Sequence, residues 1–432
     1  MNRIGLAKDP RKGQVTMYEF LLSHQDLEIR DRVRHFAKTQ VPRELLLDMD
    51  SDRVKFPREF LERCAASGIL GVRFPKELGG QGLGWTAEIA ALEEMGVTNM
   101  SLSCLYSLVS ICGEALVHFG TPQQIEKYLK PTLRGELFCA EALTEPRGGS
   151  DFFGATTVAV RHGDTYLLNG QKRFVVGAEG ADYFLVYART SEDPNVSRHE
   201  SISLFLVEKE MGVKAEYLYG LMGTRGGGAG RLVFRDVSVP AENLILGEGR
   251  GAEIFYQMMI PERMTTAAGC IGLAREALRI AARYSTRRKA FGQKIQKFQG
   301  VSFKVADGTM KLDAMRGAVF LAARAIDLRQ DSGLQRRLVS QAKRFSSETC
   351  LDVVSLAMQI CGGIGYTNIY PIERMFRDAR LASIWTGTSE VMNLIIQHEF
   401  YKELMDEEES GTIRNVELDA EESQAQEEKI YE

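Results

Sequence analysis

The chain has 432 residues, of which 44% are hydrophobic and 26% charged, the composition of an ordinary soluble globular protein of two or three domains. Its formal net charge of −4 excludes a chain-wide basic surface of the kind that binds nucleic acid. Hydropathy predicts no stable membrane insertion, and the first residues predict no signal or transit peptide.

Charge and cysteine usage vary along the chain. Residues 406–432 carry a net charge of −9 and leave +5 on the remainder, so this acidic tail is predicted to be disordered. The seven cysteines lack any C-x-x-C spacing, which argues against a metal site. Unpaired thiols of this kind are typical of a reducing compartment, so we expect a cytoplasmic protein.

The first domain is predicted to be all helical. Residues 1–22 form a loose arm, and residues 23–135 hold the helices. Apolar residues recur at helical spacing from Asp26 until Pro42 stops the pattern. Further helices are expected at 57–67, 86–96, 101–119 and from Pro122 to before Gly135.

The pattern then changes twice, which predicts an α+β fold. Residues 136–250 alternate polar and apolar residues in short runs, typical of an antiparallel β domain. Strands are expected at 157–161, 165–168, 173–176, 183–188, 201–208 and 231–239. Residues 251–405 return to helical spacing and predict a C-terminal four-helix bundle, with helices at 252–285, 300–330, 335–361 and from Ser389. Pro261, inside the first of these, predicts either a kink or the start of a new helical segment.

Two neighbouring segments draw attention as a ligand site. ALTEPRGGSD at 142–151 combines hydroxyl side chains with flexible glycines where helices give way to strands, and NGQKRFVVG follows at 169–177. Such a loop exposes backbone N–H groups to a ligand. Taken alone, however, it is as well explained by an ordinary turn.

These two segments resemble the acyl-CoA dehydrogenase family, in which the first lies against FAD and the next strand covers the flavin ring. The resemblance continues, in the family's order, through LMGTRG at 221–226, RRKAFG at 287–292, QICGGIGY at 359–366 and TGTSE at 386–390. It covers the chain from about Ser23 to about Phe400 and implies that family's fold: a helical N-terminal domain, a middle β domain and a C-terminal helical bundle.

The resemblance implies a set of FAD contacts. The matching residues are Leu143, Thr144, Gly149, Ser150, Phe174, Val176, Arg288, Phe291, Gln299, Gln359, Gly362, Gly363, Thr388 and Glu390. Val176 stands where a hydroxyl commonly bonds the flavin, which puts the redox tuning in doubt. Arg288, Phe291 and Gln299 match residues that reach a neighbouring subunit's FAD, so the resemblance implies an oligomer, and we expect a homotetramer.

The catalytic base of most family members is a glutamate at the position of Thr386, whose hydroxyl cannot serve as a base at neutral pH. A minority, resembling isovaleryl-CoA and long-chain acyl-CoA dehydrogenases, carry it on the first long helix of the C-terminal domain, where this chain has Glu262 before Arg263. We expect Glu262 to be the base, with Thr386 contributing its backbone N–H and Ser150, Arg263 and Gly387 contacting substrate; the alternative is a solvated Glu262 on the helix surface.

Glu141 is an unusual charge next to the loop. It is interpreted as a solvent-facing residue, with a second acid or base as the alternative.

The function implied is α,β-dehydrogenation of an acyl-CoA to a 2-enoyl-CoA in fatty acid or carboxylic acid catabolism, with electrons passing to an electron-transfer flavoprotein. Several alternatives stay open. The substrate could be a branched or alicyclic acyl-CoA, the enzyme could work as an enoyl-CoA reductase or an oxidase, and the protein could be a non-catalytic or DNA-binding flavoprotein.

Overall fold

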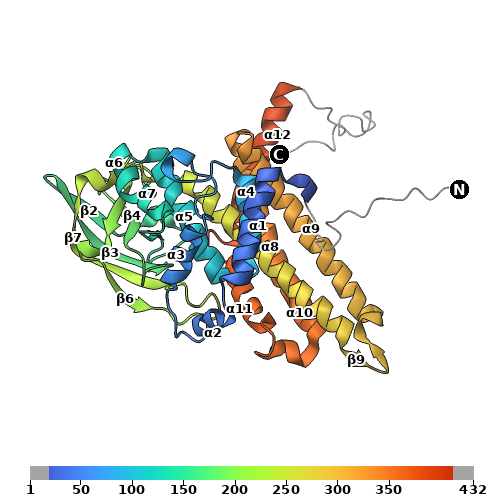
Figure 1. The fold of residues 1–432 in the computed structure, drawn as a ribbon. Coiled ribbons are helices and arrows are strands. Elements are labelled where there is room, and N and C mark those ends of the chain that lie inside the picture. Colours follow the sequence, from blue (N-terminus) through green and yellow to red (C-terminus); the bar gives the residue numbers. More distant parts are fainter. Residues whose placement is uncertain (1–18, 412–432) are drawn as a thin grey trace, which may run out of the picture.

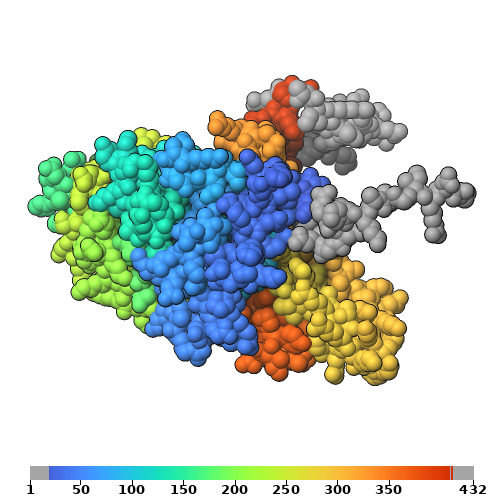
Figure 2. All heavy atoms as spheres, in the orientation of Figure 1, coloured from blue at the N-terminus to red at the C-terminus, as the bar shows by residue number. Residues whose placement is uncertain are grey.

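Helices from both ends of the chain pack beside a sheet formed by its middle, as Figure 1 shows for this computed structural model. The structure describes residues 19–411. The predicted arm therefore lies largely outside the described residues, and so does most of the acidic tail. Figure 2 shows the N-terminal helices, in blue, between the green sheet and the orange C-terminal helices on this face of the molecule.

The N-terminal region is helical, as predicted. Its main helices begin at side-chain caps: Ser23 forms a capping box before α1, and the Asn99 side chain accepts from the N–H of Leu102 at the start of α5. The elements are η1 (Glu19–Leu21), α1 (His24–Thr39), α2 (Arg43–Asp50), α3 (Arg58–Ala66), η2 (Lys76–Leu78), α4 (Trp85–Gly96), α5 (Met100–Phe119), α6 (Pro122–Gln124), a π-helical turn η3 (Ile125–Leu129) and α7 (Lys130–Leu133).

Eight strands form one mixed sheet in the order β6-β7-β3-β2-β4-β5-β8, with β1 paired to β4. They are β1 (Cys139–Ala142), β2 (Val158–His162), β3 (Thr165–Val175), β4 (Tyr183–Arg189), β5 (Ile202–Glu208), β6 (Lys214–Leu218), β7 (Gly230–Pro240) and β8 (Leu244–Ile245), joined by turns η4 (Phe152–Gly154), η5 (Lys209–Met211) and η6 (Ala241–Asn243). Most pairs are antiparallel, as expected, whereas β1 and β2 run parallel to β4. The sequence predicted two strands, at 165–168 and 173–176, where the structure has the single strand β3. Its pairing with β7 shifts register twice between these two stretches.

The C-terminal region forms the helical bundle. Its elements are α8 (Gly251–Arg287), β9 (Lys289–Ala290), β10 (Gln293–Lys294), η7 (Ile295–Lys297), α9 (Gln299–Asp327), α10 (Ser332–Cys361), η8 (Gly362–Tyr366), α11 (Ile372–Ala382) and α12 (Ser389–Ser410). The last helix thus extends beyond residue 405, the boundary expected from the sequence. A helix–strand–helix order and a bundle after the sheet agree with the predicted fold class.

Pro261 does not begin a new helical segment, so of the two predicted alternatives only the kink stays a prediction. It is buried inside α8, which runs without interruption from Gly251 to Arg287. Proline removes one backbone hydrogen bond from a helix. Contacts of α8 with α4, α5 and α10 bury its surface on several sides, and we attribute the unbroken helix to this packing.

The helix α5 lies in the middle of the core. Of the described helices, α5 and the stretch Ser332–Tyr366 have the length and hydropathy of a membrane span. In α5, however, 89% of that apolar window is buried inside the molecule, against α8 and β1 among others. Its hydropathy is therefore that of a core helix.

Candidate functional site

A largely apolar cavity of about 560 Å³ lies where α5, β1, β3 and α8 meet the segment before α12. Eleven of the residues predicted from the sequence line it: Leu143, Thr144, Gly149, Ser150, Phe174, Val176, Glu262, Arg263, Thr386, Gly387 and Thr388. These residues are separated by more than half the chain, and the fold brings them to one place. The cavity is thus the candidate active site.

The loop at 142–151 is held by a buried ion pair. Lys172, on β3, is fully buried; its Nζ lies 2.7 Å from Oε1 of Glu145 and 3.2 Å from the carbonyl oxygen of Leu143. Glu145 also accepts hydrogen bonds from the Thr156 hydroxyl and from the backbone N–H groups of Thr156 and Thr157. Burial raises the pKa of Glu145, but Lys172 and these donors outweigh it and hold the pKa to about 2. The loop is therefore fixed in place by charge.

Glu262 and Glu141 face each other in the cavity, so the solvent-facing interpretation of Glu141 was wrong. Side chains alternate along β1: Ala140 and Ala142 pack into the core of the sheet, which turns Cys139 and Glu141 toward the helices. Burial raises the pKa of Glu141 well above its usual value, and the neighbouring Glu262 raises it further. Burial also raises the pKa of Glu262, opposed by a hydrogen bond with Glu141 and by Arg263.

Cationic groups lie at the far side of Glu262. Arg263 is 6% exposed, and burial lowers its pKa to about 10 despite the neighbouring Glu262. Lys343, fully buried on α10, donates to the carbonyl oxygen of Gly387, and burial lowers its pKa to about 8. The backbone that carries Thr386 and Gly387 is thereby fixed relative to Glu262.

The cavity also has the features of a site for a flat, polar-edged group. Phe174 and Thr386 have positive φ angles of 57° and 52°, which cost energy in residues with a β-carbon and are concentrated at ligand sites. Among residues 19–411, the buried Nε1 of Trp385 and Oγ1 of Thr386 have no hydrogen-bond partner. Phe174 lines the cavity with half of its surface exposed. Apolar walls with free polar groups at the edge suit the ring system of a flavin.

The other predicted FAD contacts lie away from this cavity. Arg288 follows the end of α8, Phe291 is in the turn between β9 and β10, and Gln299 begins α9. Gln359, Gly362 and Gly363 lie at the end of α10, and Figure 1 shows β9 at the end of the bundle away from the sheet. Glu390 is exposed in the first turn of α12. A single chain therefore brings together one part of the predicted FAD site and leaves the other exposed, with Phe291 95% exposed.

Sequence reasoning missed the Glu145–Lys172 pair and the carboxyl pair. Spacing alone gave no signal for the first, because Lys172 lies among the polar residues Asn169, Gln171 and Arg173 of its strand. It also missed lining residues on α5, among them Cys104 and Ser107. Their positions depend on how α5 crosses the sheet, which residue spacing does not reveal.

Comparison with known proteins covers nearly the whole chain. Residues 23–136, 140–237 and 249–400 match the N-terminal, middle and C-terminal domains of acyl-CoA dehydrogenase. The chain is 37% identical to the caffeyl-CoA reductase–Etf complex subunit CarC of Acetobacterium woodii, covering 87% of this chain and 97% of that one. It is 35% identical to the short-chain-specific acyl-CoA dehydrogenase of Clostridium acetobutylicum, covering 89% and 100%. The structure of butyryl-CoA dehydrogenase from Megasphaera elsdenii superimposes with a TM-score of 0.84 at 31% identity, covering 88% and 99%.

Proposed function

The chain belongs to the acyl-CoA dehydrogenase family, and we propose that Glu262 is the base with which it removes the α proton of an acyl-CoA thioester. The protein is an FAD-dependent oxidoreductase acting on CH–CH donors, and the reaction is α,β-dehydrogenation to a 2-enoyl-CoA. The observation that carries the proposal is the position of Glu262: its carboxyl group lies in the apolar cavity beside the family's motif residues, whereas Thr386 offers no carboxylate.

The residues of the cavity divide the work of this reaction. The Glu262 carboxylate takes the proton from the α carbon, and the buried positive charge of Arg263 favours its ionised form. Apolar walls keep water away from the thioester, which strengthens every polar contact within the site. FAD, when bound, accepts the hydride that leaves the β carbon.

The proposed flavin site uses the fixed loop and the opposite wall. Leu143, Thr144, Gly149 and Ser150 line the cavity. So do Phe174, on β3, and Val176, directly after that strand. Thr388, the N-cap of α12, and Gly387 line it on another side, with Glu390 nearby in the same helix. Ser150, Arg263 and Gly387 are the proposed substrate contacts. Val176 has no hydroxyl for the flavin, so any donor there has to come from the backbone.

The second group of predicted contacts fits an assembly of several chains. An exposed turn at one end of the bundle carries Phe291, with Arg288 before it and Gln299 after it. The same end of the bundle carries Gln359, Gly362 and Gly363. An exposed phenylalanine at a turn tip is costly in water and favours burial against a partner. We therefore propose a homotetramer in which these residues complete the FAD site of a neighbouring subunit.

The electron partner and the direction of the reaction follow from the relatives. One similar protein is named as a subunit of a reductase–Etf complex and another as a dehydrogenase. We propose an electron-transfer flavoprotein as the redox partner and the cytoplasm as the location. Dehydrogenation is the preferred direction, with reduction of an enoyl-CoA as the alternative.

Anaerobic mixing with acyl-CoA thioesters tests the proposed function. Straight, branched and cyclic thioesters should be compared while the flavin absorbance is followed, and one class is expected to bleach it. The isosteric Glu262→Gln variant should fold, hold FAD and lose bleaching by about 10²-fold or more, because it lacks the base. Glu136→Gln, which changes an exposed carboxyl outside the cavity, is the control and should bleach at close to the original rate. Equal bleaching by Glu262→Gln would reject Glu262 as the base.

A further inference from the structure

The contact between Glu141 and Glu262 is unusual because neither carboxylate can donate a hydrogen bond. The Oε1 atom of Glu141 is buried and has no partner among the hydrogen-bonding groups of residues 19–411. Two ionised carboxylates in an apolar cavity would repel each other strongly. A hydrogen bond between them, which burial and proximity both favour, requires a proton on one of the two.

The surroundings do not neutralise a second negative charge. On β3, Lys172 is the nearest cation to Glu141, but its Nζ is bound to Glu145 and to a backbone carbonyl. Burial raises the pKa of Cys104 and Cys112 on α5 and of Tyr187 on β4, so these groups in the same region are neutral.

Two cations act on Glu262, whereas Glu141 is near only Lys172, which is already paired with Glu145. Arg263 on α8 and Lys343 on α10 both act on Glu262, and neither acts on Glu141. The two carboxyl groups are therefore chemically different: Glu262 is the more easily ionised member, and Glu141 is the one that keeps a proton.

We propose, on the basis of the function assigned above, that Glu141 and Glu262 share one proton at neutral pH and work as a pair, with Glu141 positioning and supplying the proton that passes through Glu262. Glu262 touches the substrate. Glu141 acts through it and is a positioning residue rather than a second base at the substrate.

The state in which the two carboxyl groups share one proton can then begin both the oxidation of an acyl-CoA and the reduction of an enoyl-CoA. In oxidation, the Cα–H bond breaks, its proton joins Glu262, and the hydride leaves the β carbon with its electron pair for the flavin. The pair now holds two protons and releases one to solvent. In reduction, the shared proton moves onto Glu262 and then to the α carbon, while the hydride arrives at the β carbon from reduced flavin. The pair regains one proton from solvent.

Titration of the two carboxyl groups by infrared spectroscopy tests this pairing without turnover. Protonated and ionised carboxyl groups absorb at different frequencies, so buried groups can be counted between a pH of about 5 and about 10. The native protein should show two separate transitions. Glu141→Gln should lose the more alkaline one, and Glu262→Gln should move the midpoint of Glu141 down by about one pH unit or more, because it removes the neighbouring charge.

Glu136→Gln is the matched control, since Glu136 is an exposed carboxyl shortly before the same strand and pairs only with Arg134 among the described groups. It should leave both transitions in place. A midpoint of Glu141 that is unchanged in Glu262→Gln, or a native protein with no alkaline transition, would overturn the pairing.

The same variants link the pair to the reaction. Enoyl-CoA reduction by the reduced protein should fall at alkaline pH in the native protein, because the pair has then lost the proton that goes to the α carbon. In Glu141→Gln this fall should begin at a lower pH, because Glu262 alone has to hold the proton. Identical pH profiles in both proteins would overturn the role of Glu141. If no thioester reduces the flavin of the native protein, the proposed function fails, whereas the infrared titration still decides whether the two carboxyl groups share a proton.

Discussion

Glu145 and Lys172 connect a loop to a strand through charge. Both side chains are buried, so water cannot solvate the charge that remains when one partner is removed. Breaking a buried pair on one side typically costs about 3–5 kcal/mol, because the remaining charge is left uncompensated. The pair holds the carbonyl oxygen of Leu143 as well, so its loss also alters the cavity wall.

Glu145→Gln tests this connection. We expect the free energy of unfolding to fall by about 3–5 kcal/mol and the Kd for FAD to rise, because the loop loses its charged anchor. Urea unfolding and a flavin fluorescence titration measure the two effects. Asp151→Asn is the control within the same loop: Asp151 forms a half-exposed pair with Arg147, and its loss should cost under about 1 kcal/mol. Equal costs for the two variants would contradict the role of the buried pair.

At single residues, the sequence predicted correctly many of the residues that line the cavity but not the direction of the Glu141 side chain. The eleven residues predicted correctly to line the cavity were identified from the order of motifs along the chain, which does not depend on the direction of any side chain. Glu141 was misplaced because the four-residue strand β1 was not recognised, and the alternation that turns Glu141 inward exists only once that strand pairs with β4.

The position of Glu262 depends on how closely α8 can approach its neighbours. Glycines make this approach possible: a β-carbon on Gly272 would lie 2.1 Å from the carbonyl oxygen of Glu93, and one on Gly96 would lie 2.5 Å from that of Gly269. Backbone therefore meets backbone where α4 crosses α8. A close crossing of this kind leaves no room for a side chain to adjust.

Gly272→Ala is expected to destabilise the protein by about 1–3 kcal/mol, although alanine normally stabilises a helix, because the added methyl group overlaps the backbone of α4. Gly317→Ala on α9 is the matched control. Nothing lies within 4 Å of the β-carbon it would add, so it should stabilise by up to about 1 kcal/mol. Thermal unfolding of both variants measures the difference, and a stabilised Gly272→Ala would show that the helices can separate without cost.

Helices and strands were predictable where the apolar periodicity extends over many residues. They were missed where the packing of neighbouring elements determines the structure. The helices α5, α9 and α10 follow their apolar spacing. The short helix α2 and the strands β1 and β6 have too few residues for a period to appear. Pro261 is the opposite case, since its local preference for a break is overruled by burial on several sides.

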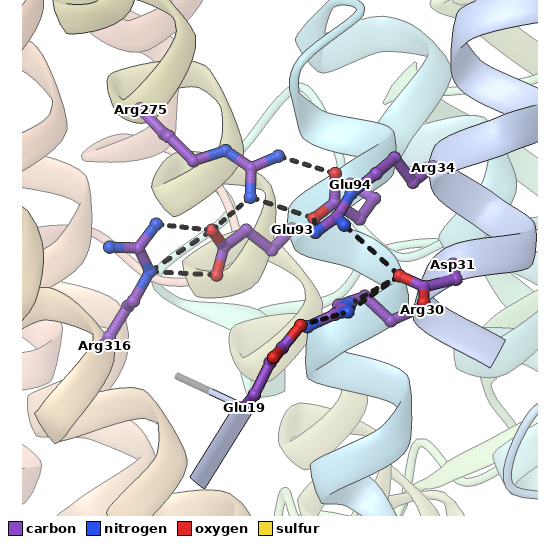
Figure 3. A network of polar contacts seen from close by, with 8 residues as sticks. All are labelled: Glu19, Arg30, Asp31, Arg34, Glu93, Glu94, Arg275 and Arg316. Carbon is purple, nitrogen blue, oxygen red and sulfur yellow. Dashed lines mark hydrogen bonds and ion pairs between the residues drawn. The ribbon is translucent and has the colours of Figure 1, made fainter. Parts of the chain in front are cut away.

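At the scale of the molecule, a network of charges joins the N-terminal helices to the bundle (Figure 3). Glu93 and Glu94 on α4 point toward Arg275 on α8, and Glu93 also contacts Arg316 on α9. Arg34 on α1 contacts Glu94 from the other side. The contacts cross between regions that the sequence could only place in order. No residue spacing predicts which glutamate meets which arginine.

Within this network, Glu94 predicts loss of stability in strong acid, whereas burial raises the pKa of Glu93 to about 7, so Glu93 contributes with the opposite sign between a pH of about 7 and about 4.5. Burial also raises the pKa of Glu94, but Arg275 and Arg34 outweigh it and hold the pKa at about 2, below the ordinary value of about 4.5. A group with a depressed pKa in the folded state stabilises above its unfolded pKa and loses that contribution as the pH falls through the folded pKa. The contribution is on the order of 3 kcal/mol and should disappear between a pH of about 4.5 and about 2.

Urea unfolding at several pH values measures this loss. In Glu94→Gln the free energy of unfolding should be lower at neutral pH and should fall less steeply as the solution is acidified. Glu136→Gln changes a carboxyl whose ion pair with Arg134 is exposed to solvent, so it should leave the slope close to that of the native protein. A slope in Glu94→Gln equal to that of the native protein would mean that Glu94 is not the group that titrates.

The walls of the cavity come from residues as far apart as Met100 and Val391. A ribosome must therefore synthesise almost all of the described chain before the walls can meet. During that time α5 has already left the ribosome, while α8, which covers it, has not yet been made. The most apolar helix of the nascent protein is thus exposed until α8 has been synthesised. Because of this order of elements, we expect α5 to need chaperone protection during translation.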